Sequence, residues 1–247
     1  MIVMVFAAGL GTRLKPLTDK MPKALVPVDG KPLLQIQIDR LYQAGVRKIV
    51  INVHHFADMI TAFTDRYHKD GLEYYISDER DKLLNTGGGL KKAGAMLRSH
   101  GINEPVLIHN VDILENADLN VFYQQICSGA DAVLMVSQRQ TKRYLLFNDD
   151  LRLVGWTNVE TGEIKSPYHH LDISSCRRLA FTGMHVVGTN VFDRMDDFPD
   201  EFSIIDFYIS QCRDLHIKGY MPQDLKIMDV GKIDELQHAA AFYKENY

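Results

Sequence analysis

The amino-acid sequence predicts an α/β fold, a Rossmann-like, doubly wound mixed sheet that is mostly parallel and gains antiparallel strands late in the chain. Short apolar runs alternate with helical patterns at about 25-residue spacing through the first 140 residues, as in a parallel sheet covered by helices. A hairpin pattern follows, because Asn148-Asp149-Asp150 separates two apolar runs as a turn would. The 247 residues are 46% hydrophobic and 24% charged, which is ordinary for a globular protein, and we expect a single domain over 1–247.

Each predicted strand of the parallel part is a short apolar run bounded by glycine or turn residues. These strands cover 1–6, 48–53, 73–77, 105–109 and 132–137. The helices between them cover 32–44, 57–67, 88–97 and 118–127. The first helix has the clearest pattern, because Leu34, Ile38 and Leu41 share one helical face and Gly45 suits the C-terminal cap.

The pattern changes after residue 140. Strands are expected at 144–147, 151–156, 179–187, 217–220 and 226–230. Helices are expected at 202–212, with Ser203 as its cap, and at 233–243. The segment 168–178 is polar and irregular, and we expect it to form a surface loop over the site.

Composition narrows the class of protein. The net charge of −4 argues against a nucleic-acid partner, which usually needs a basic surface. Cys127, Cys176 and Cys212 form no CxxC pair, which argues against a zinc site or a disulfide framework and indicates a reducing compartment. No apolar run reaches the ~18 residues of a membrane span, and no basic segment precedes the first apolar run as in a signal peptide. We therefore expect a cytoplasmic protein, a monomer or small homo-oligomer, with no membrane partner.

A loop of small and cationic residues follows the first predicted strand. Gly9 and Gly11 let backbone N–H groups approach a phosphate, and Arg13 and Lys23 supply opposing charge. The carboxyl edge of an open α/β sheet is where ligands bind. Two rival fingerprints fail, because a dinucleotide loop needs glycine at the position of Leu14 and a Walker loop needs Lys-Ser/Thr directly after Gly11. The pattern predicts a site for a nucleoside triphosphate.

The full motif of this loop is longer and more specific. It is Gly9-x-Gly11-x-Arg13-x-x-Pro16-x-Thr18-x-x-x-Pro22-Lys23. This motif resembles the signature of the sugar-phosphate nucleotidyltransferases, which join a nucleoside triphosphate to a sugar 1-phosphate and release pyrophosphate. The resemblance implies a nucleotidyltransferase (GT-A-like) fold and a nucleotide bound by Ala7, Ala8, Gly9, Gly11, Thr12, Arg13 and Lys23. Arg13 and Lys23 are the expected catalytic residues, because cations can neutralise the charge that develops on the leaving pyrophosphate.

Two aspartates extend the resemblance. Asp112 ends Asn110-Val111-Asp112 after the fourth strand, and Asp229 lies in Met228-Asp229-Val230-Gly231 before the last helix. The family's aspartates at these places bind Mg²⁺, so the resemblance implies Mg²⁺ as cofactor, with Asp112 and Asp229 as its ligands. Mg²⁺ accepts such carboxylates from separate strand ends, with waters and phosphate oxygens completing its octahedron. Val111 departs from the family's small residue, and its β-branched side chain disfavours a positive φ.

A third motif, Leu84-x-Thr86-Gly87-Gly88-Gly89, stands where these enzymes recognise the nucleobase. The resemblance implies contacts to the base from Thr86, Gly87 and Gly88. The motif resembles in particular the bacterial N-acetylmuramic acid 1-phosphate uridylyltransferases. It therefore favours UTP as the nucleotide and N-acetylmuramic acid 1-phosphate as the candidate sugar substrate.

The sugar phosphate needs a cation of its own. Many family members use a lysine in Glu-Lys-Pro, a triplet that this chain lacks. Lys165 is the nearest candidate, and Asn158, Thr182 and Gly183 are the candidate sugar contacts. By this division residues 1–140 form a nucleotide-binding half and residues 141–247 a sugar-binding half.

Several alternatives stay open at this point. The same motifs fit a guanylyltransferase acting on mannose or heptose 1-phosphate, or a cytidylyltransferase. A non-catalytic nucleotide-binding regulatory protein is a candidate of another class, and pyrophosphate release would distinguish it from the enzymes. A dinucleotide-dependent oxidoreductase is disfavoured by Leu14.

Overall fold

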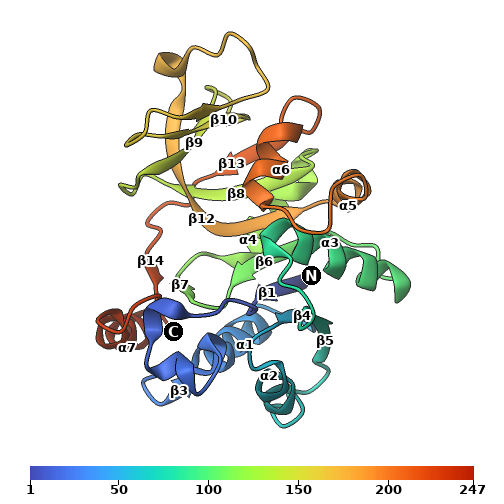
Figure 1. The fold of residues 1–247 in the computed structure, drawn as a ribbon, viewed down its shortest axis with the longest axis vertical. Coiled ribbons are helices and arrows are strands. Elements are labelled where there is room, and N and C mark those ends of the chain that lie inside the picture. The colour runs from blue at the N-terminus through green and yellow to red at the C-terminus, as the bar shows by residue number, and fades with distance from the viewer.

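A ten-stranded mixed sheet forms the centre of the protein in a computed structural model that describes residues 1–247 (Figure 1). Its parallel part has the order β5 (Glu73–Asp78), β4 (Lys48–Val53), β1 (Ile2–Phe6) and β6 (Val106–Asn110). Because β1 pairs in parallel with both β4 and β6, the chain winds outward from β1 in two directions. Such a reversal opens a crevice at the carboxyl ends of the strands.

The rest of the sheet is largely antiparallel. Its strands are β8 (Ala132–Ser137), β9 (Arg143–Phe147), β10 (Leu153–Asn158), β11 (Ile164–Lys165), β12 (Arg177–Val187) and β13 (Ile217–Tyr220). The long strand β12 pairs with β6, β8 and β9, and β13 joins β8 in parallel. The predicted fold class is confirmed, with the difference that β12 separates β8 from the other parallel strands. Val186 and Val187 are buried on opposite faces of β12, as expected of an internal strand.

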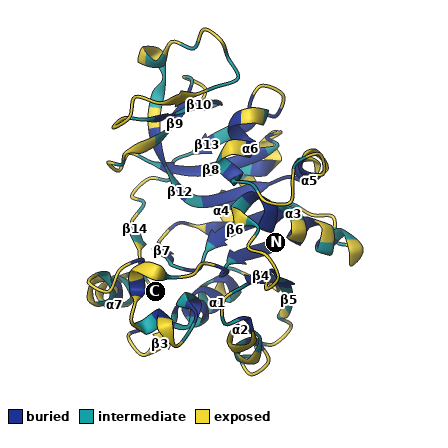
Figure 2. Ribbon diagram, in the orientation of Figure 1, coloured by how far each residue is buried: buried dark blue, intermediate teal, exposed yellow.

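Two helical layers cover the sheet. One face carries α1 (Leu33–Gln43), α2 (Ala57–Thr64), α4 (Leu119–Gln124) and α7 (Glu235–Asn246) over a buried cluster of 32 residues. The other carries α3 (Asn85–Ser99), α5 (Thr189–Met195) and α6 (Ile204–Gln211) over a buried cluster of 26 residues. Val3 and Val5 of β1 pack into the first cluster and Ile2 and Met4 into the second, because successive strand residues point to opposite faces. Figure 2 shows the sheet as a buried layer between helices that are exposed outward. None of these helices has both the length and the apolar character needed to cross a membrane.

Short elements complete the chain, and the sequence predicted few of them. They are the strands β2 (Pro27–Val28), β3 (Lys31–Pro32), β7 (Ile113–Glu115) and β14 (Ile227–Asp229), and the 3-10 turns η1 (Thr12–Leu14), η2 (Leu17–Asp19), η3 (Lys23–Leu25), η4 (Gln125–Ser128) and η5 (Ile173–Ser175). β2 pairs with β3, and β7 pairs with β14, each pair forming a small sheet of its own. Only β14 corresponds to a predicted strand.

Two helix starts follow directly from side-chain chemistry. The Asp118 carboxylate accepts hydrogen bonds from the N–H groups of Asn120 and Val121 at 2.9 and 3.0 Å. The Ser203 hydroxyl accepts one from the N–H of Ile205 at 3.2 Å, which confirms the predicted cap of α6. Both side chains satisfy N–H groups that the first turn of a helix leaves free.

A buried histidine lies in the middle of the sheet. His185 of β12 stands between Ile108 of β6 and Leu134 of β8, and its side chain is fully buried. The Tyr208 hydroxyl lies 3.3 Å from its Nδ1, whereas its Nε2 has no hydrogen-bond partner. Burial lowers the pKa of His185 from 6.5 to about 3, so the ring is neutral in the folded protein at neutral pH.

We expect this histidine to make the fold sensitive to acid. Between pH 6.5 and about 3 the unfolded chain binds a proton that the folded chain does not bind. The group's contribution to stability is therefore complete above pH 6.5, and it is lost as the pH falls, by up to about 1.4 kcal/mol per pH unit. Urea unfolding at several pH values should show a smaller loss for His185→Phe than for the wild type. The same substitution at the exposed His170 is the control, and equal slopes for wild type and His185→Phe would contradict the prediction.

Candidate active site

A cleft of about 530 Å³ opens at the carboxyl ends of the four parallel strands. Nine residues that the sequence singled out line it, namely Ala7, Ala8, Gly9, Gly11, Thr12, Arg13, Lys23, Thr86 and Asp112. They come from the loop after β1, the start of α3 and the turn after β6. The crevice that the strand order creates is thus the place where the predicted phosphate loop and the first predicted metal ligand meet.

The shape of the loop after β1 depends on Gly11 and Thr18. Gly11 has a φ of +63°, a conformation that favours glycine. The Thr18 hydroxyl donates a hydrogen bond to the Gly11 carbonyl at 2.8 Å, and a Cβ on Gly11 would lie only 2.8 Å from Thr18 Cγ2. Gly9, in contrast, has open space beside it. The spacing of the motif is therefore explained by one glycine that closes the turn and another that leaves room in the cleft.

Two cations pair with two carboxylates at the cleft, where Arg13, Lys23 and Asp112 are lining residues and Asp229 is not. Lys23 Nζ contacts the Asp112 carboxylate, and these side chains are only 12% and 19% exposed. Arg13 Nη2 lies 3.9 Å from the Asp229 carboxylate, with 58% and 54% of these side chains exposed. Lys23 and Asp112 therefore form the inner pair, and Arg13 and Asp229 the outer pair.

A small ribbon brings the two aspartates together although they are far apart in the sequence. Asp112 lies in the turn between β6 and β7, and Asp229 is the last residue of β14, which pairs antiparallel with β7. The N–H of Val230 donates to the carbonyl of Asp112 at 2.8 Å. A Cβ on Gly231 would lie 2.7 Å from both Arg13 Nη2 and Asp229 Oδ1, so glycine is needed where the chain passes them.

These donors fit a magnesium ion. Mg²⁺ is usually held by one or two carboxylates, with waters and substrate phosphates as the other ligands. The structure offers two carboxylates beside the loop after β1, and no group of three or more His, Cys, Asp or Glu side chains in the chain could hold a metal ion. Two oxygen ligands at an open cleft match a cation shared with a substrate better than they match a closed structural site.

The floor of the cleft is formed by two residues that belong to none of the sequence motifs, Asn52 and Glu79. Asn52, at the end of β4, accepts a hydrogen bond from the Ala7 N–H at 2.7 Å and donates one to Glu79 Oε1 at 2.8 Å. Glu79, just after β5, accepts another from the Leu84 N–H at 3.1 Å. Both side chains are buried and line the cleft. The sequence did offer a signal for them, because each of these polar residues stands at the carboxyl end of a predicted parallel strand, where ligands bind.

The remaining lining residues are Phe6, Leu83, Asn85, Asn110, Val111, Glu201 and Gly231. Val111 is buried in the core, and its N–H donates to the Phe6 carbonyl at 3.1 Å. Its φ is not positive, as expected of a β-branched residue. Leu83 and Glu201 enter the cleft from loops that carried no motif.

The triple glycine packs against the segment that precedes α6. α3 begins at Asn85, so the glycines lie in its first turns. The N–H groups of Gly87 and Gly88 donate to the Phe202 carbonyl at 2.9 and 3.3 Å, and a Cβ on Gly88 would lie 1.9 Å from the Asp200 carbonyl. These two glycines pack closely against Phe202 and Asp200 and do not line the cleft, and their contact with a base stays a prediction. Thr86 does line the cleft.

The predicted sugar-binding residues lie outside the cleft. The Thr182 hydroxyl donates to the Met135 carbonyl at 2.9 Å, and Asn158 accepts from the Glu160 N–H at 3.0 Å. Lys165 pairs with Asp206 at 3.1 Å. Gly183 comes nearest, because a Cβ there would lie 2.4 Å from Nδ2 of Asn110, which does line the cleft.

The segment 168–178 does not cover the cleft, which corrects the expectation of a loop over the site. None of its residues lines the cleft. The Tyr168 hydroxyl donates to the Cys212 carbonyl at 3.4 Å, and a Cβ on Gly155 would lie 3.2 Å from Leu171. The loop therefore packs on β10 and the end of α6.

Comparisons with known proteins agree with this geometry. A family model described as Nucleotidyl transferase matches residues 2–148. The N-acetylmuramate alpha-1-phosphate uridylyltransferase of Caulobacter vibrioides is 32% identical over 231 residues, which cover 91% of this chain and 89% of that protein. The D-glycero-alpha-D-manno-heptose 1-phosphate guanylyltransferase of Aneurinibacillus thermoaerophilus is 32% identical over 147 residues, 58% of this chain and 61% of that one.

Solved structures extend the likeness of the fold to the whole chain. A UDP-glucose pyrophosphorylase from Acinetobacter baumanii superimposes with a TM-score of 0.79 at 15% identity, covering 98% of this chain and 93% of that chain. The family match spans more than half of the sequence and includes both the phosphate loop and Asp112. The chain therefore belongs to the sugar-phosphate nucleotidyltransferase family and is an enzyme of that class.

Proposed function

We propose that this protein is a Mg²⁺-dependent enzyme that joins UTP to a sugar 1-phosphate, with N-acetylmuramic acid 1-phosphate as the candidate sugar, and releases pyrophosphate. The observation that carries the proposal is the pairing of Arg13 and Lys23 with Asp229 and Asp112 at one cleft. The choice of UTP is supported by the uridylyltransferase that aligns with 91% of this chain.

In this reaction an oxygen of the sugar 1-phosphate attacks the α-phosphorus of the nucleotide, and pyrophosphate leaves on the opposite side. The attacking phosphate is already an anion, so no side chain has to remove a proton from it. The enzyme instead accelerates the reaction by holding two repelling anions together and by neutralising the charge that moves to the leaving group. Bound between Asp112 and Asp229, Mg²⁺ would supply part of that neutralisation.

The chain's own cations supply the rest. In the structure Lys23 and Arg13 each contact one of the two carboxylates. Both can turn to phosphate oxygens once a divalent cation balances the carboxylates. Arg13 suits the β- and γ-phosphates, because a planar guanidinium can hold two oxygens at once, and Lys23 acts as a point charge deeper in the cleft.

We also propose a division of labour within a single domain. Most of the cleft lining comes from residues 1–140, the nucleotide-binding half, whereas residues 141–247 contribute Glu201 and Gly231. The sugar-binding half would reach the cleft beside Asn110, where Gly183 approaches it closely. Any contact of the sugar with Lys165, Asn158 or Thr182 would lie outside the cleft, because none of these residues lines it.

A guanylyltransferase acting on a heptose or mannose 1-phosphate is the second candidate, and one observation favours it. The buried Glu79 carboxylate lines the cleft and accepts one hydrogen bond at each oxygen, so each keeps capacity for another. Guanine offers a carboxylate two neighbouring N–H donors, whereas uracil offers one. The heptose 1-phosphate guanylyltransferase that matches 58% of the chain supports the same reading.

Pyrophosphate release tests both candidates. The purified protein is incubated with Mg²⁺, each of the four nucleoside triphosphates and a panel of sugar 1-phosphates. Release with UTP and N-acetylmuramic acid 1-phosphate supports the first proposal, and release with GTP and a heptose or mannose phosphate supports the second. Nucleotide binding without pyrophosphate release from any pair would favour a regulatory protein and contradict both.

A further inference from the structure

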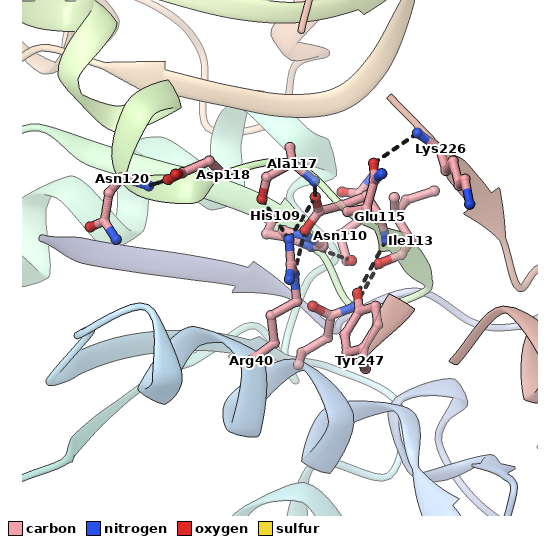
Figure 3. Close-up of polar contacts among 12 residues, drawn as sticks. Arg40, His109, Asn110, Ile113, Glu115, Ala117, Asp118, Asn120, Lys226 and Tyr247 are labelled. Carbon is pink, nitrogen blue, oxygen red and sulfur yellow. Dashed lines mark hydrogen bonds and ion pairs between the residues drawn. The ribbon is translucent and has the colours of Figure 1, made fainter. Parts of the chain in front are cut away.

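A group of polar side chains, none of which lines the cleft, gathers around the strand that follows Asp112. It consists of Arg40 from α1, His109 from β6, Glu115 from β7 and Tyr247 just after α7, and we call it the Glu115 cluster (Figure 3). His109 and Glu115 stand on the two strands that the Asp112 turn connects. The cluster therefore holds both ends of the turn that carries the inner carboxylate.

Glu115 is the centre of the cluster, and its side chain has no exposed surface. Arg40 donates from Nε to Oε1 at 2.7 Å and from Nη2 to Oε2 at 2.9 Å, a two-point contact. The same Nη2 donates to the Ala117 carbonyl at 2.6 Å. His109 Nε2 lies 3.6 Å from Oε1, and its Nδ1 lies 2.8 Å from the Asn110 carbonyl. Burial alone would raise the pKa of Glu115, but His109 and Arg40 outweigh it and hold the pKa below its usual value.

A buried ion pair of this kind contributes little net stability to a protein core. Taking two charges out of water costs several kcal/mol per ion, and apolar side chains of similar volume at such positions often give an equally stable or more stable protein. A role in geometry is therefore a better explanation of the cluster than a role in stability. The candidate for that role is the backbone to which Glu115 belongs.

That backbone carries the two candidate metal ligands. β7 and β14 form a two-stranded sheet with no third strand, and such pairs are marginal in isolation. Three side-chain contacts hold β7. The Glu115 N–H donates to the Tyr247 hydroxyl at 3.1 Å, Gln37 of α1 donates to the Ile113 carbonyl at 2.6 Å, and Arg40 binds the Glu115 carboxylate.

We propose that Arg40, Glu115 and Tyr247 are positioning residues that set the separation of Asp112 and Asp229 and thereby the affinity for the divalent cation. They act through β7, since none of them lines the cleft. The inference rests on the proposed metal role of the two aspartates. It adds that the affinity of this site is fixed by the Glu115 cluster, which does not line the cleft.

The main test replaces the ion pair by apolar side chains in the double variant Arg40→Met/Glu115→Leu, which should keep the core filled. Mn²⁺ binding to the full chain is measured by electron paramagnetic resonance, without any substrate. We expect the Mn²⁺ dissociation constant to rise about tenfold, the lower end of the effect of supporting partners at metal sites. Assays should show the same rise in the Mg²⁺ concentration needed for half activity, with kcat near the wild-type value at saturating Mg²⁺.

Tyr247→Phe provides a milder variant if the double variant does not fold. It removes the hydroxyl that accepts from Glu115 and keeps the ring, and it should weaken Mn²⁺ binding severalfold. Tyr208→Phe is its control, because it also removes a tyrosine hydroxyl, one that lies against His185 in the other core cluster. Wild-type Mn²⁺ affinity in folded Tyr247→Phe and in the folded double variant would overturn the proposal.

The failure of the metal assignment has a different outcome. Asp112→Asn should abolish Mn²⁺ binding by the otherwise wild-type protein. If it does so while the Glu115 cluster variants bind normally, the positioning role is wrong and the metal site stands. If Asp112→Asn binds Mn²⁺ like the wild type, the metal assignment is wrong, and the positioning proposal is overturned with it.

Discussion

Replacing Asp112 or Asp229 with alanine is expected to lower kcat by at least ~10³-fold while the protein stays folded. A metal ion held by these carboxylates contributes several kcal/mol to charge stabilisation, and each tenfold change in rate corresponds to about 1.4 kcal/mol. Asp112 should be the more sensitive of the two, because its side chain is 19% exposed and that of Asp229 is 54% exposed. The measurement is pyrophosphate release at saturating substrates over a range of Mg²⁺ concentrations.

A matched control separates this effect from a general loss of acidic charge. Asp193 is exposed and pairs only with Arg98, away from the cleft, so Asp193→Ala should keep full activity. Circular dichroism and thermal unfolding show whether each variant is folded. Full activity of either Asp112→Ala or Asp229→Ala at ordinary Mg²⁺ concentrations would refute the metal assignment.

The parts of the site that could be predicted are those with a local signal. The loop after β1 is encoded by its own residues, because Gly11 needs a positive φ and Thr18 binds its carbonyl. Asp112 follows a predicted strand, and the end of that strand's apolar run places Asp112 at the carboxyl edge of the sheet. Asp229 lies in a predicted strand, 226–230, but its partner β7 has only three residues and was not predicted, so only the resemblance connected Asp229 to Asp112.

The parts that could not be predicted depend on which segments meet in space. A triple glycine indicates that something approaches the backbone closely, but the sequence does not say what, and in the structure it is Phe202 and Asp200. The place of β12 between β6 and β8 is likewise a choice among partners that its apolar pattern leaves open. The contact between Arg40 and Glu115 joins α1 to β7, and neither residue carries a motif.

Arg13→Ala is expected to lower kcat by at least ~100-fold, the size of effect seen when one group that stabilises transition-state charge is removed. Arg13 is a better probe of catalysis than Lys23, because its side chain is 58% exposed and its contact with Asp229 is 3.9 Å long. Exposed ion pairs contribute only about 0–1 kcal/mol to folding, so a loss of activity will not reflect a loss of stability. Replacing Lys23, whose side chain is 12% exposed, would leave the largely buried carboxylate of Asp112 without its partner.

Steady-state kinetics distinguish the proposed role of Arg13 from simple binding. The KM for the sugar 1-phosphate should change little, since Arg13 would contact the phosphates that leave. Arg13→Lys should recover only part of the rate, because an ammonium group cannot hold two phosphate oxygens as a guanidinium does. Lys15→Ala is the control within the same loop, because Lys15 is 60% exposed, pairs with Asp19 at 3.1 Å and does not line the cleft. If Arg13→Ala changed only the KM of the sugar 1-phosphate, Arg13 would be a contact of the sugar 1-phosphate. The departing pyrophosphate would then be bound by Lys23.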